Sequence, residues 1–451
     1  MSVHRSAVGR RQLRIGGPVV SAGTGVPAAE EGIRADDPHQ SLVRFLKRLT
    51  WLQLTCSGEG AEDIEGSVVD AARQLGGEAS VLVVPDGATV TVDSHARSTT
   101  VGVRGFPEIF RMDQLASLKL LLRAVAFGEA DVHEADRRLI EIIDSPPPYP
   151  WWLKLLGIVL FSVGFAPLMQ ATWYEVGSTA VIACLPAAMA VGATHLPRLE
   201  KVLPLAASTA VSLVTLEVFA RSPADGGPVL LMLPALFYFI PGDYLSAASA
   251  ELAGGYITTG AIRIVYATFL LVQLYLGVIV GLTLSGRPPR VLLDASAPAN
   301  LPTWVLWGCW IPFTVGTVLA FAIPMRFLWR LLVLIYATVG VQLLITRHAG
   351  EIGGTFAAAV VLGLAATWSA RHSHQPPRVL LLLPGFFALT AGSLGVRGLT
   401  ALTGGYSTQG YHDLTEMVEI VTAVAIGIFL GTVLTQPSVE RREGTVDQPA
   451  R

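Results

Sequence analysis

The pattern of apolar positions divides the chain near residue 150. Beyond this point long apolar runs follow one another, and a helix that crosses a bilayer needs about 20 mostly apolar residues. Ten runs meet this condition, which predicts an α-helical polytopic membrane protein with about ten spans. The expected spans are 153–171, 176–194, 202–220, 228–246, 261–284, 302–323, 328–346, 353–370, 378–402 and 415–435.

Before residue 150 the pattern changes to that of a small α/β domain. Amphipathic periodicity indicates four helices, and between the second and third lie three short segments rich in β-branched residues. The expected helices are 41–55, 59–75, 113–126 and 129–143, and the expected strands are 79–84, 89–93 and 99–103, with a turn at 85–87.

The apolar half of the chain contains an internal repeat. The segment GGYITTG at 254–260 returns as GGYSTQG at 404–410, and the segment FSVG at 161–164 returns as FTVG at 313–316. The glycine pair of the first copy, Gly277 and Gly281, returns as Gly427 and Gly431, and this small-xxx-small spacing predicts close helix packing. Each copy holds five expected spans. An odd number of spans reverses direction, which predicts a 5+5 inverted repeat of the kind found in transporters.

The repeat and the change of pattern define the expected domains. These are a disordered tail at 1–40, a cytosolic α/β domain at 41–148, a first membrane repeat at 149–285, a second membrane repeat at 300–436, and a disordered cytosolic tail at 437–451.

Composition supports this division and narrows the functional classes. The chain is 52% hydrophobic, 15% charged and has a mean hydropathy of +0.54, whereas soluble domains carry about 25% charged residues. A net charge of -2 gives no support for nucleic-acid binding. The three cysteines, Cys56, Cys184 and Cys309, are far apart, so we expect neither a disulfide framework nor a metal site, and we expect no cofactor.

Basic residues in the short loops predict the orientation. With the N-terminus in the cytoplasm, nine basic residues fall on the inner side and five on the outer side. This bias predicts a multi-pass protein of the cell membrane with both termini cytoplasmic. The inner residues are Arg198, Lys201, Arg263, Arg326, Arg330, Arg371, Arg378, Arg441 and Arg442, and the outer residues are Arg221, Arg287, Arg290, Arg347 and Arg397.

Two kinds of position are candidates for gating and substrate contact. The duplicated GGY turns provide glycines with wide backbone freedom and hydroxyls for a polar substrate. A proline–glycine pair inside a spanning segment is expected to break or kink the helix and to free backbone groups that face a wet cavity. The residues concerned are Gly254, Gly255, Tyr256, Thr258 and Gly260 with Pro241 and Gly242 in the first copy, and Gly404, Gly405, Tyr406, Thr408 and Gly410 with Pro384 and Gly385 in the second. We expect Tyr256 and Tyr406 to approach one central pathway from opposite sides.

Ionisable residues within the spanning half are few, and such residues often mark ion or substrate paths. Asp243 and Glu251 are the favoured proton carriers on the inner side. Arg263 occupies the repeat position equivalent to Asp413, and Glu416 enters the last span.

The combined pattern resembles the threonine/serine exporter family over about residues 41–435. The resemblance rests on Gly58 followed by the acidic segment 59–65, on Leu75-Gly76, on Pro241-Gly242 before Gly260 and Arg263, and on Pro384-Gly385 before Gly410. The chain departs from the family at 62–65, where Glu-Asp-Ile-Glu replaces a common basic element. The resemblance implies export of small hydroxy amino acids driven by the proton gradient, with an amino acid, protons and the bilayer as partners, and it leaves an oligomer open.

Three alternatives stay open at this point. Split relatives of the same family are implicated in dicarboxylate export. A membrane-anchored enzyme would need a catalytic front domain, but the chain shows no GxSxG elbow and no P-loop, and His133-Glu134 lacks the second histidine of a zinc protease motif. The front domain also has the position of a regulator or gate.

Overall fold

Two hydrophobic cores organise the chain, one in the front domain and one among the apolar helices. The computed structural model describes residues 37–56, 59–84, 86–105, 111–194, 202–220, 227–292, 300–370, 376–389 and 391–435. All of these belong to one unit, which begins at Arg34. The expected tails at 1–40 and 437–451 lie almost wholly outside the described residues.

The front domain is an antiparallel sheet with helices packed against it. Its strands pair in the order β1-β2-β3, with Val90 of the central strand opposite Val81 and Val101. The helices supply most of its core, which includes the fully buried Phe45 and Leu49. All seven predicted elements are confirmed to within a few residues: α1 (Pro38–Cys56), α2 (Ala61–Gln74), β1 (Glu78–Val84), β2 (Gly87–Ser94), β3 (Arg97–Arg104), α3 (Met112–Ala126) and α4 (Val132–Ile143).

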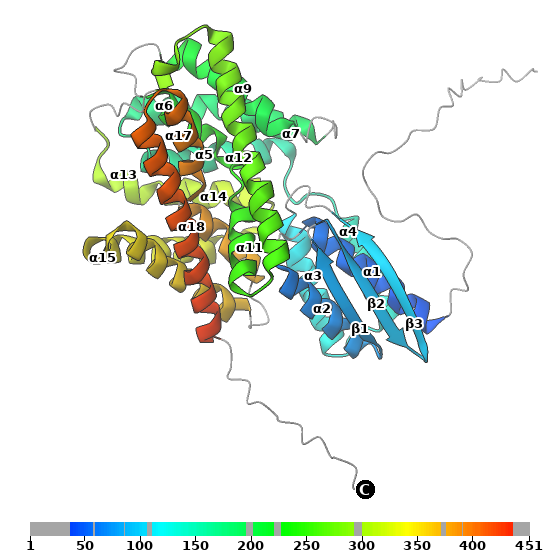
Figure 1. Ribbon diagram of the computed structural model, residues 1–451. Coiled ribbons are helices and arrows are strands. Elements are labelled where there is room, and N and C mark those ends of the chain that lie inside the picture. Colours follow the sequence, from blue (N-terminus) through cyan, green and yellow to red (C-terminus); the bar gives the residue numbers. More distant parts are fainter. Residues whose placement is uncertain are drawn as a thin grey trace, which may run out of the picture. The chain divides into compact units, whose positions relative to one another are not determined.

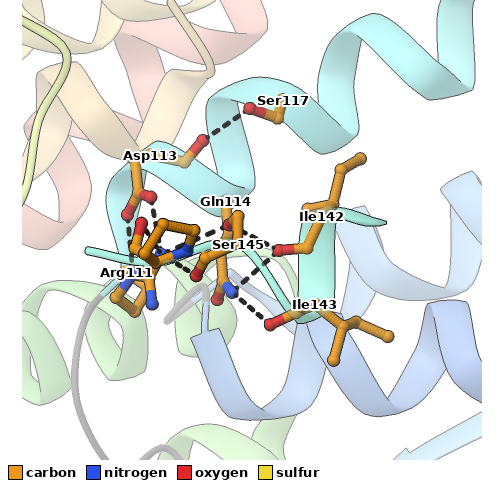
Figure 2. Close-up of polar contacts among 8 residues, drawn as sticks. Arg111, Asp113, Gln114, Ser117, Ile142, Ile143 and Ser145 are labelled. Carbon is orange, nitrogen blue, oxygen red and sulfur yellow. Dashed lines mark hydrogen bonds and ion pairs between the residues drawn. The ribbon is translucent and has the colours of Figure 1, made fainter. Parts of the chain in front are cut away.

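A polar cluster holds the segment that leads from the front domain to the first apolar helix (Figure 2). Arg111 binds the Asp113 carboxylate through two nitrogens, at 2.9 and 2.8 Å, and donates to the carbonyl of Ser145 at 3.0 Å. Gln114 donates from Nε2 to the carbonyls of Ile142 and Ile143, both at 3.0 Å. These carbonyls lie in the last turn of α4, where the helix runs out of its own donors, and the Ile142 carbonyl also accepts the N–H of Ser145 at 3.3 Å. The cluster therefore both caps the helix and fixes the start of the linker.

The apolar half consists of helices that follow the predicted spans, with several interruptions. The first copy contains α5 (Trp151–Phe165), η1 (Ala166–Leu168), α6 (Trp173–Ile182), α7 (Cys184–Ala193), α9 (Leu203–Val214), η2 (Thr215–Phe219), α10 (Pro228–Leu236), η4 (Phe237–Phe239), α11 (Gly242–Ala253) and α12 (Ile257–Ser285). After η5 (Pro289–Leu292), the second contains α13 (Thr303–Gly308), α14 (Trp310–Ala320), η6 (Met325–Phe327), α15 (Leu328–Ala370), α16 (Arg378–Ala388), α17 (Ala391–Thr403) and α18 (Ser407–Thr435).

Among the described residues, six helical stretches are long and apolar enough to cross a membrane. The difference from ten has two structural reasons. The seventh and eighth predicted spans lie in one stretch, 325–370, in which two helices meet at the non-helical backbone of Gly350. The third contains a single shorter apolar helix, Leu203–Phe219, whereas the fourth and the ninth are each divided between two helices, α10 and α11 in the fourth and α16 and α17 in the ninth.

The two copies pack in corresponding ways. The α12 helix packs on α9, and α18 packs on α15. A Cβ at Gly277 would lie 2.6 Å from the carbonyl oxygen of Leu205, and a Cβ at Gly427 would lie 2.7 Å from that of Phe356. No side chain fits at either contact, so the predicted packing role of these glycine pairs is confirmed. In Figure 1, α12 and α18 run in opposite directions.

Candidate functional site

Each copy contains a helical hairpin closed by the same glycine turn. Gly255 and Gly405 have φ values of 88° and 90°, in the left-handed region that favours glycine. In both copies the backbone N–H of the next residue donates to a backbone carbonyl of the first helix. Tyr256 donates to the carbonyl of Glu251 at 2.8 Å, and Tyr406 donates to the carbonyl of Ala401 at 3.0 Å. These are helix C-terminal caps, which reverse the chain without leaving carbonyls unpaired.

The two helices of each hairpin lie in close contact just after the turn. A Cβ at Gly260 would lie 2.7 Å from Cγ of Leu252, and one at Gly410 would lie 2.5 Å from Cγ of Leu402. The hairpins also touch each other, because α11 packs on α18 and α17 packs on α12. Tyr275 of α12 and Thr403 of α17 share a hydrogen bond of 2.6 Å across this contact.

A buried ion pair bridges the first hairpin and reaches the front domain. Arg263 lies 3.2 Å from Oε1 of Glu251, whose side chain is 2% exposed. The same carboxylate oxygen accepts the backbone N–H of Ala61, the first residue of α2, at 3.1 Å. Arg263 also donates to the carbonyl oxygen of Glu59 at 2.8 Å. The pair therefore holds α11, α12 and the start of α2 together.

The second hairpin carries an ion pair of its own, with the charges exchanged between helices. Arg397 of α17 binds Asp413 of α18 through two nitrogens, at 2.9 and 2.7 Å, and Gln409 adds a hydrogen bond of 2.8 Å. Asp413 is fully buried. The acid of the first hairpin, Glu251, lies on α11, the helix before the turn. The acid of the second hairpin, Asp413, lies on α18, the helix after the turn. Arg397 was expected in an outer loop, and this expectation was wrong, because the residue lies inside α17.

The two proline–glycine pairs differ. Ile240 is extended and a new helix begins at Gly242, so the predicted break at Pro241-Gly242 is confirmed. Pro384 and Gly385 lie inside α16, which continues to Ala388, so the helix does not break at this pair, and a kink there stays a prediction. The counterpart of Pro384, 150 positions earlier, is Pro234, which also lies inside a helix. A helix tolerates such a proline when neighbouring groups satisfy the freed carbonyl.

The remaining candidates are dispersed. Thr258 and Thr408 are exposed, Tyr406 and Glu416 are half-buried, and Asp243 lies in α11 with its side chain outside the described residues. Tyr256 packs against the core of the front domain. A pathway shared by the two tyrosines stays a prediction.

Further contacts join the front domain to the apolar helices. Lys119 of α3 donates to the carbonyls of Ala370 at 2.8 Å and Pro376 at 3.2 Å. Arg378 lies 3.9 Å from the carboxylate of Asp63. Burial raises the pKa of Glu59 to about 8, and the charge of Asp63 adds to this shift. Burial likewise lowers the pKa of Lys119 to about 8, with a contribution from the charge of Arg123.

One buried acid was not singled out in the sequence. Glu175 is fully buried near the start of α6, and Gln170 lies beside it. The local signal was present, since Thr172 followed by Glu175 has the spacing of a helix capping box. Within the described residues, no group of three or more His, Cys, Asp or Glu side chains could hold a metal ion.

Apolar helices in two similar halves, with a buried ion pair within each half, define a multi-pass membrane protein. Residues 52–285 match the family model described as "Putative threonine/serine exporter". The chain belongs to the threonine/serine exporter family. The match covers the front domain from the end of α1 onward and the whole first copy.

Two relatives extend the similarity over most of the chain. A protein of Mycobacterium tuberculosis named "Probable threonine/serine exporter" is 26% identical over 435 residues, which are 89% of this chain and 78% of that protein. An uncharacterized protein of Schizosaccharomyces pombe is 22% identical over 438 residues, 89% of this chain and 57% of that protein. No solved structure matches.

Proposed function

We propose that this protein exports threonine and serine across the cell membrane by alternating access, with proton entry as the driving force. The proposal combines family membership with one structural observation, the pair of corresponding hairpins α11–α12 and α17–α18. A hairpin whose turn needs a left-handed glycine and whose helices are joined by one ion pair is a suitable moving gate, because a few residues at the end of an element can absorb the backbone change of a hinge.

In this proposal the ten predicted spans form an inverted repeat with both termini in the cytoplasm. The opposite directions of α12 and α18 in Figure 1 support it. The exchanged ion pairs, Glu251 with Arg263 and Arg397 with Asp413, would each hold one gate closed. Inverted repeats allow two such gates on opposite faces to exchange roles by a rocking movement.

We further propose that the front domain regulates the first gate. Its helix α2 contributes the Ala61 N–H to the buried carboxylate of Glu251, and Arg263 holds the Glu59 carbonyl. Opening of the first hairpin would therefore have to break contacts with the front domain. This coupling gives the domain a role that does not require catalysis.

The test is transport by the purified full-length chain in proteoliposomes. We expect efflux of labelled threonine and serine that increases with an imposed proton gradient and stops when an ionophore collapses the gradient. Succinate serves as the competing substrate. Transport of succinate without transport of threonine or serine would contradict the proposal, and so would threonine flux that ignores the proton gradient.

A further inference from the structure

A single buried carboxylate in the first copy has no cationic partner among the described residues. Glu175 is fully buried at the third position of α6. Its Oε2 atom accepts three hydrogen bonds of 2.9 Å, from the backbone N–H groups of Ala171 and Thr172 and from the Thr172 hydroxyl. One oxygen of the carboxylate is thus committed to capping the helix.

The other oxygen, Oε1, is buried and accepts no hydrogen bond within the described part of the chain. Glu251 also has one buried oxygen, Oε2, without a hydrogen bond among the described residues, but its carboxylate pairs with Arg263, and that of Asp413 pairs with Arg397. A buried carboxylate without a positive charge or a donor is costly in free energy.

Gln170 brings a second unused acceptor to the same cluster. Its Nε2 atom donates to the Thr179 hydroxyl at 2.6 Å and to the carbonyl of Leu230 at 2.8 Å. Since a carbonyl only accepts, the Leu230 contact fixes which end of the amide is the nitrogen. Oε1 of Gln170 is therefore the atom left buried without a partner. Thr179 lies one helical turn after Glu175 on the same face of α6, so Gln170, which is bonded to Thr179, and Glu175 both lie on this face.

The second copy shows that the fold does not require this acid. At the offset of 152 that relates Phe161 to Phe313, Glu175 corresponds to Phe327 and Gln170 to Ala322. Phe327 is 2% exposed, so the second copy has a buried apolar side chain at the position that corresponds in sequence to Glu175. An aromatic side chain is enough for packing at this position in the second copy. The carboxylate of the first copy therefore points to a role in binding a ligand rather than in stabilising the fold.

We propose that Oε1 of Glu175 and Oε1 of Gln170 form a binding site for one positively charged hydrogen-bond donor during transport. Two ligands fit this description, namely a proton held by Glu175 and the ammonium group of the transported amino acid. The inference rests on the proposed export function and names the residues that would take its positive charge. Glu175 replaces Asp243 and Glu251 as the preferred proton carrier, because Glu251 is already paired with Arg263.

Few other charges surround the site. The described elements with the most extensive packing on α6 are α5, η1, α7 and α10. Their titratable side chains are Lys154 and Cys184, and α6 itself adds Tyr174, whose hydroxyl donates to the Phe219 carbonyl of η2, the element that carries Glu217. Lys154 lies near the opposite end of α5, roughly 16 Å along the helix axis from its C-terminus. A proton or ammonium group would therefore be the main positive charge at Glu175.

The experiment compares Glu175→Gln with the full-length wild-type protein in proteoliposomes, with Glu217→Gln as the matched control at an exposed acid of the same copy. Glutamine keeps the shape and the capping oxygen but neither ionises nor pairs with a cation. Two assays are used, namely threonine efflux driven by a pH gradient and threonine exchange at equal pH on both sides.

If the ligand is a proton, Glu175→Gln loses gradient-driven efflux by roughly tenfold or more, the effect of a charged hydrogen bond, while exchange continues. If the ligand is the ammonium group, both assays fall by a similar factor and threonine no longer raises the melting temperature of the variant. Wild-type rates in both assays would overturn the inference. Absence of threonine and serine transport by the wild-type protein would instead overturn the proposed function.

Gln170→Leu is the second variant, in case Glu175→Gln does not fold. It removes the second acceptor and leaves the carboxylate in place. We expect the midpoint of the pH dependence of efflux, or the KM for threonine, to shift by roughly tenfold in proton or substrate concentration. A midpoint and a KM equal to those of the wild-type protein would overturn the inference.

Discussion

Phe161 of α5 and Phe313 of α14 stack with their ring centroids 5.0 Å apart, and each ring belongs to the same four-residue motif in its own copy. The glycines of these motifs make reciprocal contacts. A Cβ at Gly164 would lie 2.3 Å from the backbone nitrogen of Phe313, and a Cβ at Gly316 would lie 2.2 Å from that of Phe161. Reciprocal contacts of this kind characterise an interface with approximate two-fold symmetry.

Replacement of either glycine by alanine should therefore destabilise the contact between the copies. We expect Gly164→Ala and Gly316→Ala each to lower the free energy of unfolding by about 1–3 kcal/mol, because the backbones must move apart. Gly177→Ala in α6 is the control, since a Cβ there meets nothing within 4 Å. Thermal unfolding in detergent is the measurement. Equal melting temperatures for all three variants would contradict the reciprocal packing.

Substitutions of the turn glycines should impair the protein for a different reason. A Cβ at Gly255 or Gly405 meets no atom within 4 Å, so a side chain has space but the left-handed backbone opposes it. We expect Gly255→Val and Gly405→Val to abolish threonine flux while the protein still inserts into the membrane. Asparagine tolerates this conformation, so Gly255→Asn and Gly405→Asn should keep most of the flux. Transport by both valine variants at the wild-type rate would mean that the turns are only connectors.

The ion pair of the second hairpin should be sensitive to loss of one partner. Arg397→Met leaves the carboxylate of Asp413 buried with only Gln409 as a donor among the described residues, and we expect a loss of about 3–5 kcal/mol in stability. The double variant Arg397→Met with Asp413→Leu removes both charges and should recover most of that loss. Chemical or thermal unfolding of the three proteins checks this. A double variant no more stable than Arg397→Met would show that the cost does not come from the unpaired charge.

The contact between the front domain and the first hairpin can be removed at a single atom. Ala61→Pro deletes the N–H group that donates to Glu251, and proline is tolerated at the first position of a helix such as α2. Gly60 is already extended, at φ -68° and ψ 156°, as a residue before proline prefers. We expect faster hydrogen exchange at the end of α11 and in the turn. Ala61→Gly retains the N–H group and is the control, and equal exchange in both variants would argue against the contact.

The charge on Glu59 should make stability depend on pH. Its pKa is raised in the folded protein from 4.5 to about 8, so the folded state binds more protons than the unfolded state between these values. Stability from this residue is fully present below about 4.5 and is lost as the pH rises toward about 8. Lys119, with its pKa lowered from 10.5 to about 8, acts in the opposite direction above that range. We expect the melting temperature to fall less steeply over this interval in Glu59→Gln, and an unchanged slope would contradict the assignment.

Much of the architecture could be predicted from the sequence, because it depends on local rules. Apolar runs of sufficient length indicate spans, β-branched segments indicate strands, and a glycine turn that recurs in the same context indicates a duplicated hairpin. These signals predicted the elements of the front domain, the glycine contacts of α12 and α18, and the break at Pro241. The sequence did not distinguish Pro384, where the helix continues, from Pro241, where it breaks, because a proline signals only a missing donor, whereas the neighbouring helices decide whether the segment breaks.

The pairing of charged residues was decided by the tertiary structure alone. Arg397 and Asp413 lie on different helices, and their contact depends on the rotation of each helix about its axis, which an all-round apolar sequence does not specify. Ala61 meets Glu251 across 190 residues of chain. The sequence likewise does not indicate that Glu175 and Gln170 each have a buried oxygen without a hydrogen bond in the described part of the chain. The burial of an atom and its hydrogen bonds depend on how the helices pack. The chain by itself determined the repeated helical elements, and their packing decided which charges are paired and which buried carboxylate has no cationic partner among the described residues.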